Sequence, residues 1–271
     1  MLEAVLFDYD GTLADTKERQ FAWMHHWAAI NLKIIRDSET GEVLDTPEMF
    51  WPVYNRIINK SGVQGVYDYF GLPCDMNDMN HPVWIAYEAF KLKNPVPLYP
   101  GIREAILEMH ELGNLRSDTK MKHRVRLGIN TTNSWPSIKN ELGLSGVLGC
   151  FDTHVTAEDL NDFLGYGKQG AINKPSKVSC ALSLMKLDAR GSLTLHIGDT
   201  IADLKASLDV RRPDNPYSGE NLITVGVSWG YEGPEALIKG FKTDAGSYHF
   251  SHLVQSPSQL PRIMEQYCLK K

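Results

Sequence analysis

Two aspartates near the N-terminus are the first residues that could do chemistry. Residues 8–13 read DYDGTL, with Asp8 and Asp10 as the carboxylates. They follow the apolar run 4–7, which is typical of a short buried strand. An ordinary aspartate, with a pKa of about 3.9, is ionised at neutral pH, so it can attack an electrophile or bind a cation without a base. Taken alone, the segment also fits a turn, because Asp and Gly are common turn residues.

A second polar cluster, residues 130–134, reads NTTNS and follows the strand-like run 125–129. Its hydroxyl and amide groups can donate hydrogen bonds to phosphate oxygens. Ser, Thr and Asn are also the preferred helix caps, so the cluster by itself favours a cap.

The third cluster is Lys174-Pro175. Proline suits the first position of a helix. This predicts that Lys174 lies beside a positive helix end, where an anion is favoured. A lone lysine is otherwise usually a solvated surface residue.

The fourth cluster, residues 198–203, reads GDTIAD. Asp199 ends a strand-like run, and Asp203 lies four residues further on. The two carboxylates share a face if a helix begins here. The structural alternative is a helix cap made by Asp or Thr.

The elements around these clusters predict how they are brought together. Strand-like runs at 125–129, 193–197 and 222–227 alternate with helical spacing around 102–109 and 178–185. This alternation predicts an α/β fold with a doubly wound parallel sheet, a Rossmann-like core with helices on both faces. Ligands of such sheets bind at the carboxyl ends of the strands.

The stretch from 15 to 97 has a different character. Trp23, Trp27, Ile30 and Ile34 have helical spacing, as do apolar residues within 83–90. We therefore predict a core formed by 1–14 and 98–271, with 15–97 as an inserted helical domain.

Arg56 and Lys60 lie one helical turn apart in this stretch. They could contact an anionic substrate, although a solvated face is the favoured interpretation.

The order of the four clusters is more specific than any one of them. This order resembles the haloacid dehalogenase-like (HAD) superfamily of phosphotransferases. The resemblance runs from Asp8 to Asp203 and consists of strand–DxDGT, strand–Thr, Lys-Pro and strand–GDxxxD, in that order. The stretches 97–101, PLYPG, and 228–231, SWGY, look like those of its phosphoglycolate phosphatase-like members. A helical insert after the first motif is similar to the cap domain of that branch.

The resemblance implies a role for each matching residue. Asp8 is the nucleophile and a metal ligand. Asp10 is the general acid and base, and its backbone carbonyl binds the metal. Thr131 and Lys174 hold the phosphoryl oxygens. Asp199 binds magnesium directly, and Asp203 supports the metal site.

The family pattern is not met everywhere. Asn173 stands where the lysine motif usually has glycine. Thr132 competes with Thr131, although Thr131 is preferred because it comes first beyond the strand and Asn130. The polar, basic segment 114–124 has no functional interpretation, and a solvated loop is expected there.

A charge count supports a magnesium cofactor. The four aspartates bring −4 and Lys174 brings +1, which leaves −3 and repels a phosphate dianion. One Mg²⁺ reduces this to −1, and a proton on Asp10 neutralises it. An all-oxygen ligand set suits magnesium rather than zinc. We expect hydrolysis of a small phosphorylated metabolite, phosphoglycolate-like or a sugar phosphate, through an aspartyl phosphate.

Composition narrows the partners. The chain has 271 residues and a formal net charge of −5, which gives no general attraction to nucleic acid or anionic membranes. No apolar run approaches the ~18 residues of a membrane span. Its four cysteines are far apart and suggest neither zinc nor disulfides. We expect a cytoplasmic protein, and the sequence indicates no oligomeric state.

Other functions stay open. A phosphomutase on the same scaffold needs every residue named above. A dehalogenase has no need for the acid–base carboxylate of Asp10. Receiver domains in signalling share the acid, Thr and Lys pattern, but they are shorter and have no insert. A non-catalytic phosphate-binding protein is a further alternative.

Overall fold

A computed structural model describes residues 2–75, 78, 80–115, 124–164, 172, 174–189, 193–210, 222–244 and 246–269, with 59, 164 and 269 lacking described side chains. Asn173 and most of the 114–124 segment lie outside the described residues.

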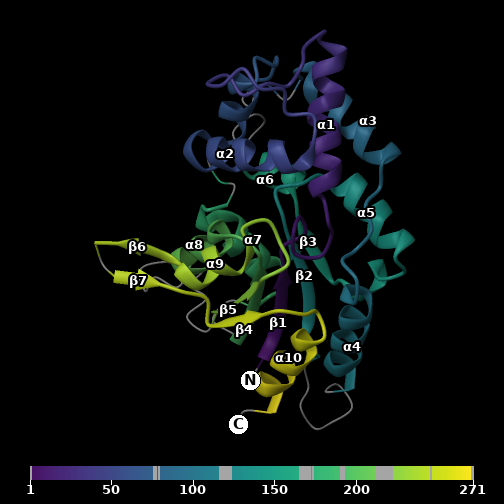
Figure 1. Cartoon of the computed structure of the whole chain (residues 1–271). Coiled ribbons are helices and arrows are strands. Elements are labelled where there is room, and N and C mark those ends of the chain that lie inside the picture. The colour runs from purple at the N-terminus through teal and green to yellow at the C-terminus, as the bar shows by residue number, and fades with distance from the viewer. Residues whose placement is uncertain are drawn as a thin grey trace.

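A parallel sheet lies at the centre of the α/β core (Figure 1). Its six strands are β1 (Leu2–Phe7), β2 (Arg126–Asn130), β3 (Thr153–Val155), β4 (Leu193–Gly198), β5 (Leu222–Val227) and β8 (His252–Val254). Their spatial order is β3-β2-β1-β4-β5-β8, and every pairing is parallel. Phe7 of β1 pairs with Ile129 of β2 and Ile197 of β4. The polar residues that follow these three strands therefore emerge side by side.

Helices cover both faces of the sheet. α4 (Ile102–Leu115), α5 (Trp135–Leu144) and α10 (Gln259–Leu269) share one hydrophobic core with Val5 and Phe7 of β1. α7 (Lys177–Lys186) and α8 (Ile201–Val210) share another core with Ala4 and Leu6. Alternate residues of β1 thus point to opposite faces, as the pleat of a strand requires. The predicted doubly wound, Rossmann-like α/β core is confirmed.

Shorter elements complete the core. They are η1 (Leu148–Cys150), α6 (Ala157–Leu164), α9 (Gly233–Lys239) and the antiparallel pair β6 (Phe241–Thr243) and β7 (Gly246–Tyr248).

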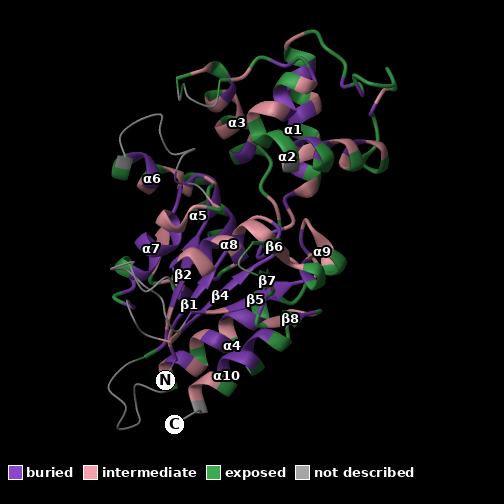
Figure 2. Cartoon of the chain, turned by 90° about the vertical axis from the view of Figure 1, so that its left-hand side faces the viewer, coloured by how far each residue is buried: buried purple, intermediate pink, exposed green. Residues whose placement is uncertain are grey.

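The helices between β1 and α4 form a second hydrophobic core of their own. They are α1 (Lys17–Ile30), α2 (Pro47–Tyr69, interrupted at Gly62) and α3 (Pro82–Lys93). Trp23, Phe50 and Val83, one from each helix, are fully buried together. Figure 2 shows these three helices grouped beyond the end of the sheet. We name residues 15–97 the helical module.

The chain enters and leaves the helical module at adjacent points. Ala14 and Leu98 form an antiparallel bridge. Beside it, the Tyr99 N–H donates to the Leu13 carbonyl at 2.9 Å. The two connections are thus tied together at the carboxyl edge of the sheet, directly after β1.

One helix ends earlier than predicted. The spacing of Trp23, Trp27, Ile30 and Ile34 predicts a helix that continues to Ile34, but α1 ends at Ile30. Leu32 takes a left-handed φ of 55°. The N–H groups of Leu32 and Lys33 donate back to Ala29 and Ala28, the pattern of a Schellman cap. Leucine rather than glycine stands at the left-handed position, so the sequence carries no stop signal there.

Among the helices of the described residues, none has both the length and the apolar content to cross a membrane.

Candidate active site

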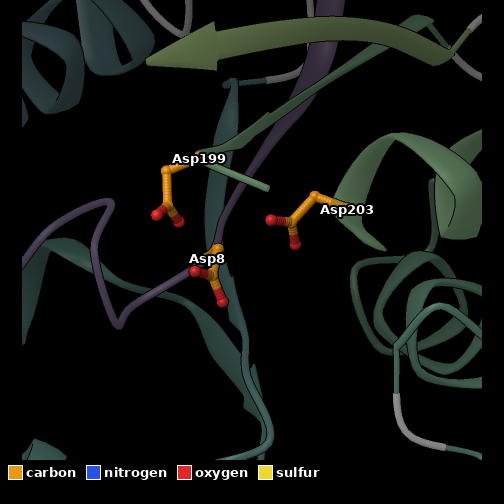
Figure 3. Close-up of side chains that lie close together, drawn as sticks. All are labelled: Asp8, Asp199 and Asp203. Carbon is orange, nitrogen blue, oxygen red and sulfur yellow. The ribbon is translucent and has the colours of Figure 1, made fainter. Parts of the chain in front are cut away.

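Three buried carboxylates meet at the carboxyl edge of the sheet. Asp8 follows β1, Asp199 follows β4, and Asp203 lies in the first turn of α8. Each offers one oxygen, and these oxygens all lie within 4.8 Å of one another. Figure 3 shows the three side chains around a common space. The spacing predicted that Asp199 and Asp203 share a helix face, but α8 begins at Ile201. Asp199 therefore precedes the helix, and a turn brings it to Asp203.

Glycines make room for this arrangement. Gly11 has a φ of 80°, and a Cβ there would lie 2.3 Å from Oδ2 of Asp199. A Cβ on Gly230 would lie 2.2 Å from the Cβ of Asp199, and one on Gly198 would lie 2.5 Å from Cγ of Asp203. The backbone must therefore lack side chains where it passes the carboxylates.

Hydrogen bonds fix the orientation of Asp199 and Asp203. The Tyr231 N–H donates to Asp199 at 2.6 Å, and the Thr12 hydroxyl donates to it at 3.0 Å. Thr200 donates to Asp203 through its hydroxyl at 2.7 Å and through its N–H at 3.2 Å. Both oxygens of each carboxylate therefore have a partner, since Lys174 pairs with the second oxygen of Asp203, but each oxygen keeps a further lone pair that a ligand can use.

Lys174 joins the cluster as the cation that contacts two of its three carboxylates, those of Asp8 and Asp203. Its ammonium pairs with Asp8 and, at 2.7 Å, with Asp203, and it donates to the Asn130 carbonyl at 3.1 Å. The predicted helix position was wrong: α7 begins at Lys177 with Ser176 as its cap, so Pro175 precedes the helix. Lys174 therefore serves the site through direct ion pairs.

The site carries uncompensated negative charge. Burial raises the pKa of Asp8 to about 7, against the lowering effect of Lys174. Burial and the nearby Asp8 raise the pKa of Asp199 well above its usual range. Burial raises the pKa of Asp203, but the charges of Lys174 and His196 and the hydrogen bonds from Lys174 and Thr200 together outweigh burial, so the pKa is lowered. Three buried carboxylates facing one ammonium favour a divalent cation, and their oxygen donors fit Mg²⁺.

Asp10 is held apart from this cluster. Its carboxylate accepts hydrogen bonds from Nδ2 of Asn133 at 3.0 and 3.1 Å and from the Thr131 hydroxyl at 3.4 Å. Thr131 is buried and Thr132 is exposed, so Thr131 is the threonine that the structure brings to the site. It contacts the predicted acid–base residue.

Sequence reasoning missed the contacts that the helical module makes with the core around Asp10. Arg19 of α1 pairs with Glu141 of α5 and lies 3.9 Å from Asp10. The Tyr9 hydroxyl donates to Glu141 at 2.6 Å. Lys91 of α3 contacts Asn133. The only sequence signal for these contacts was the position of Asn133, which comes two residues after Thr131 in the second polar cluster.

Comparison with known proteins identifies the class. The sequence profile of the haloacid dehalogenase-like hydrolases matches residues 2–210. The chain therefore belongs to this hydrolase family, and the predicted resemblance is confirmed. This also confirms the predicted enzyme class, a phosphoric monoester hydrolase of the HAD-like type.

Individual relatives are more distant. Protein CbbY of Cereibacter sphaeroides is 26% identical over 209 residues, which are 76% of this chain and 80% of CbbY. Pyrophosphatase PpaX of Bacillus velezensis is 25% identical over 238 residues, 86% of this chain and 87% of PpaX. The crystal structure of CbbY from Rhodobacter sphaeroides in complex with phosphate covers 96% of both chains with a TM-score of 0.59 and 21% identity. The structural match shows that the fold is shared.

Proposed function

We propose that this chain is a Mg²⁺-dependent phosphatase that hydrolyses a small phosphomonoester through an aspartyl phosphate on Asp8. One observation carries the proposal: Asp8 pairs with the Lys174 ammonium and lies beside two further buried carboxylates, while Asp10 is held separately. This arrangement supports a nucleophile in a phosphate site with an acid–base group beside it.

The first step is attack by a carboxylate oxygen of Asp8 on phosphorus. The bond between phosphorus and the ester oxygen breaks, and Asp10 gives its proton to the leaving alkoxide. In the second step, water attacks phosphorus, and the carboxylate of Asp10 takes the proton from it. The bond from Asp8 to phosphorus breaks, which restores both aspartates.

Lys174 stabilises the negative charge of the phosphoryl group in both steps. Its neighbours Asp8 and Asp203 hold it in place and keep it charged, since they raise its pKa against the effect of burial. Thr131 is proposed to bind a phosphoryl oxygen once Asp10 turns toward the substrate.

Asp8, Asp199 and Asp203, with the Asp10 carbonyl, would hold the metal. A bound Mg²⁺ neutralises phosphoryl oxygens and offsets charge in the transition state. The raised pKa values of Asp8 and Asp199 support a cation here, because burial and the neighbouring carboxylates both disfavour their ionised forms unless a cation is bound.

The helical module is proposed to act as the cap that selects the leaving group. The core residues bind a phosphoryl group and its metal, so they cannot distinguish alcohols. The module is tethered directly beside the catalytic edge, which suits a small phosphorylated metabolite as substrate. CbbY, a relative of similar length, was crystallised with phosphate, which supports a phosphorylated ligand.

A screen of sugar phosphates and phosphoglycolate, with free phosphate as the readout, tests the proposal. We expect release that requires Mg²⁺, stops with a chelator and is poorly restored by Ca²⁺, which prefers looser coordination. Full activity in metal-free buffer would contradict the metal assignment. Isomerised sugar phosphate without free phosphate would instead identify a phosphomutase.

A further inference from the structure

A buried lysine of the helical module points at the loop that holds Asp10. Lys91, near the end of α3, is 2% exposed. Its ammonium donates to Oδ1 of Asn133 and to the Ser134 hydroxyl, both at 2.7 Å, and pairs with Glu88 at 2.6 Å. Burying an ammonium is costly unless its donors are used, and here its described partners include two residues of the core.

The chemistry of these contacts fixes the orientation of the Asn133 amide. An ammonium only donates hydrogen bonds, and an ionised carboxylate only accepts them. The amide between Lys91 and Asp10 must therefore turn its oxygen to Lys91 and its NH₂ to Asp10. The Ser134 N–H donates to the same oxygen at 2.8 Å. Lys91 thus polarises the amide that holds Asp10.

The other nearby cation of the helical module is occupied elsewhere. Arg19 pairs through one NH group with Glu141, and its second NH₂ lies 3.9 Å from Asp10, beyond hydrogen-bond distance. The side-chain hydrogen bonds that the structure gives Asp10 therefore come from Asn133 and, at the longer distance of 3.4 Å, from Thr131. Asn133 is the principal anchor of this carboxylate.

We propose that Lys91 is a positioning residue for Asp10, acting through the Asn133 amide. A cation of the helical module thereby sets the acid–base carboxylate of the core. The inference rests on the proposed function, because it concerns the proton transfers assigned to Asp10. Among the contacts that the structure describes, Lys91 touches none of the three clustered carboxylates.

Two substrates separate this role from a general structural one. An alkyl phosphate needs a proton on its leaving oxygen, whereas p-nitrophenyl phosphate leaves as a stable anion. A misplaced Asp10 should therefore slow phosphorylation of Asp8 by the alkyl ester but not by the aryl ester. Hydrolysis of the aspartyl phosphate needs Asp10 as a base with either substrate, so the phosphoenzyme should accumulate with the aryl ester, whose first step is not slowed.

Lys91→Met is the test variant, and Lys93→Met, exposed on the same helix, is the matched control. We expect Lys91→Met to lose about tenfold or more in kcat with glycerol 2-phosphate, as for loss of a charge-assisted hydrogen bond. With p-nitrophenyl phosphate it should show a nitrophenolate burst at the wild-type rate, followed by slow turnover. The half-saturating Mg²⁺ concentration should stay unchanged, and Lys93→Met should match the wild type.

Asn133→Ser provides an independent variant, which carries the test if Lys91→Met does not fold. It should show the same burst. The double variant should have a kcat no lower than that of the less active single variant, because both changes remove the same interaction. Equal losses in burst and steady state, multiplicative losses in the double variant, or wild-type behaviour would each overturn the inference. A wild-type protein that hydrolyses neither ester would instead contradict the proposed function, and the inference with it.

Discussion

The catalytic edge of the sheet and the contact between the helical module and the core both bury charge, but they balance it differently. At the catalytic edge, three carboxylates face Lys174, which leaves two negative charges. Where the module meets the core, Arg19 pairs with Glu141, and Lys91 donates to Asn133 and Ser134 while it pairs with Glu88 of its own helix. The first arrangement favours binding of a cation, whereas in the second the buried charges are balanced by other residues of the chain.

This difference separates two kinds of polar residue in one protein. Buried charge without a protein partner is costly and marks a place where a ligand contributes. Buried charge with a partner on another element fixes geometry, because removing either partner leaves the other unsatisfied. Substitutions at the edge should therefore affect turnover more than stability, whereas substitutions of the Arg19–Glu141 pair should do the reverse.

Asp8→Asn should produce the largest effect and act on turnover alone. An amide is a poor nucleophile, so we expect loss of at least about a thousandfold in kcat, roughly 4 kcal/mol of barrier. The fold should persist, since the change is nearly isosteric and removes a costly buried charge. Phosphate release and thermal unfolding would be measured against Asp45→Asn, an exposed control. Residual activity above about a thousandth of the wild type would exclude Asp8 as the nucleophile.

Glu141→Gln should act mainly on stability. Its two oxygens accept from Arg19, Tyr9 and the Val96 N–H, and its side chain is fully buried. We expect a loss of about 3 kcal/mol in unfolding free energy, as for a broken buried ion pair. Glu108→Gln, exposed on α4, should change it by less than about 0.5 kcal/mol. Equal denaturation midpoints for the two variants would show that the contact is not structural.

Gly11→Ala tests the packing of the catalytic edge. The added Cβ would meet Asp199 and Tyr231 at 2.3 and 2.4 Å. Gly41→Ala is the matched control, because Gly41 has a similar φ of 76° but no atom within 4 Å of such a Cβ. We expect Gly11→Ala to be less stable than the control by about 1–3 kcal/mol, and to bind Mg²⁺ more weakly. The same unfolding free energy in both variants would contradict the crowding argument.

Arg56→Gln should have the smallest effect. The sequence favoured a solvated face for Arg56 and left a substrate contact as the alternative. In the structure its guanidinium pairs with Asp37 and Glu39 and donates to the Tyr69 hydroxyl at 3.0 Å. The side chain is 42% exposed, so we expect less than about 1 kcal/mol of stability to be lost. Relative rates among substrates should not change. A selective loss for one phosphorylated metabolite would restore the substrate-contact interpretation.

The catalytic edge could be predicted because each carboxylate is tied to a strand or to the helix after it. Asp8 and Asp199 directly follow β1 and β4, and adjacent parallel strands must end at the same edge. Lys174 was predicted from the order of the clusters, but its surroundings were not. Its position depends on ion pairs to residues far away in the sequence.

The contact between module and core could not be predicted in the same way. Glu141 gains its role from Arg19, 122 residues earlier, and Asn133 gains its role from Lys91, 42 residues earlier. Local spacing carries no information about such partners. It also failed at Ile34, since the left-handed Leu32 that ends α1 has no glycine signal.

The phosphorylation state of Asp8 tests the central claim most directly. Enzyme mixed with p-nitrophenyl phosphate and Mg²⁺ would be quenched in acid within the first turnovers, digested and analysed by mass spectrometry. We predict one added phosphoryl group on the peptide that contains Asp8, sensitive to hydroxylamine, increased in Asp10→Asn and missing from Asp8→Asn. An active enzyme with no phosphoryl group on Asp8 at any time, or with the group on another residue, would contradict this mechanism.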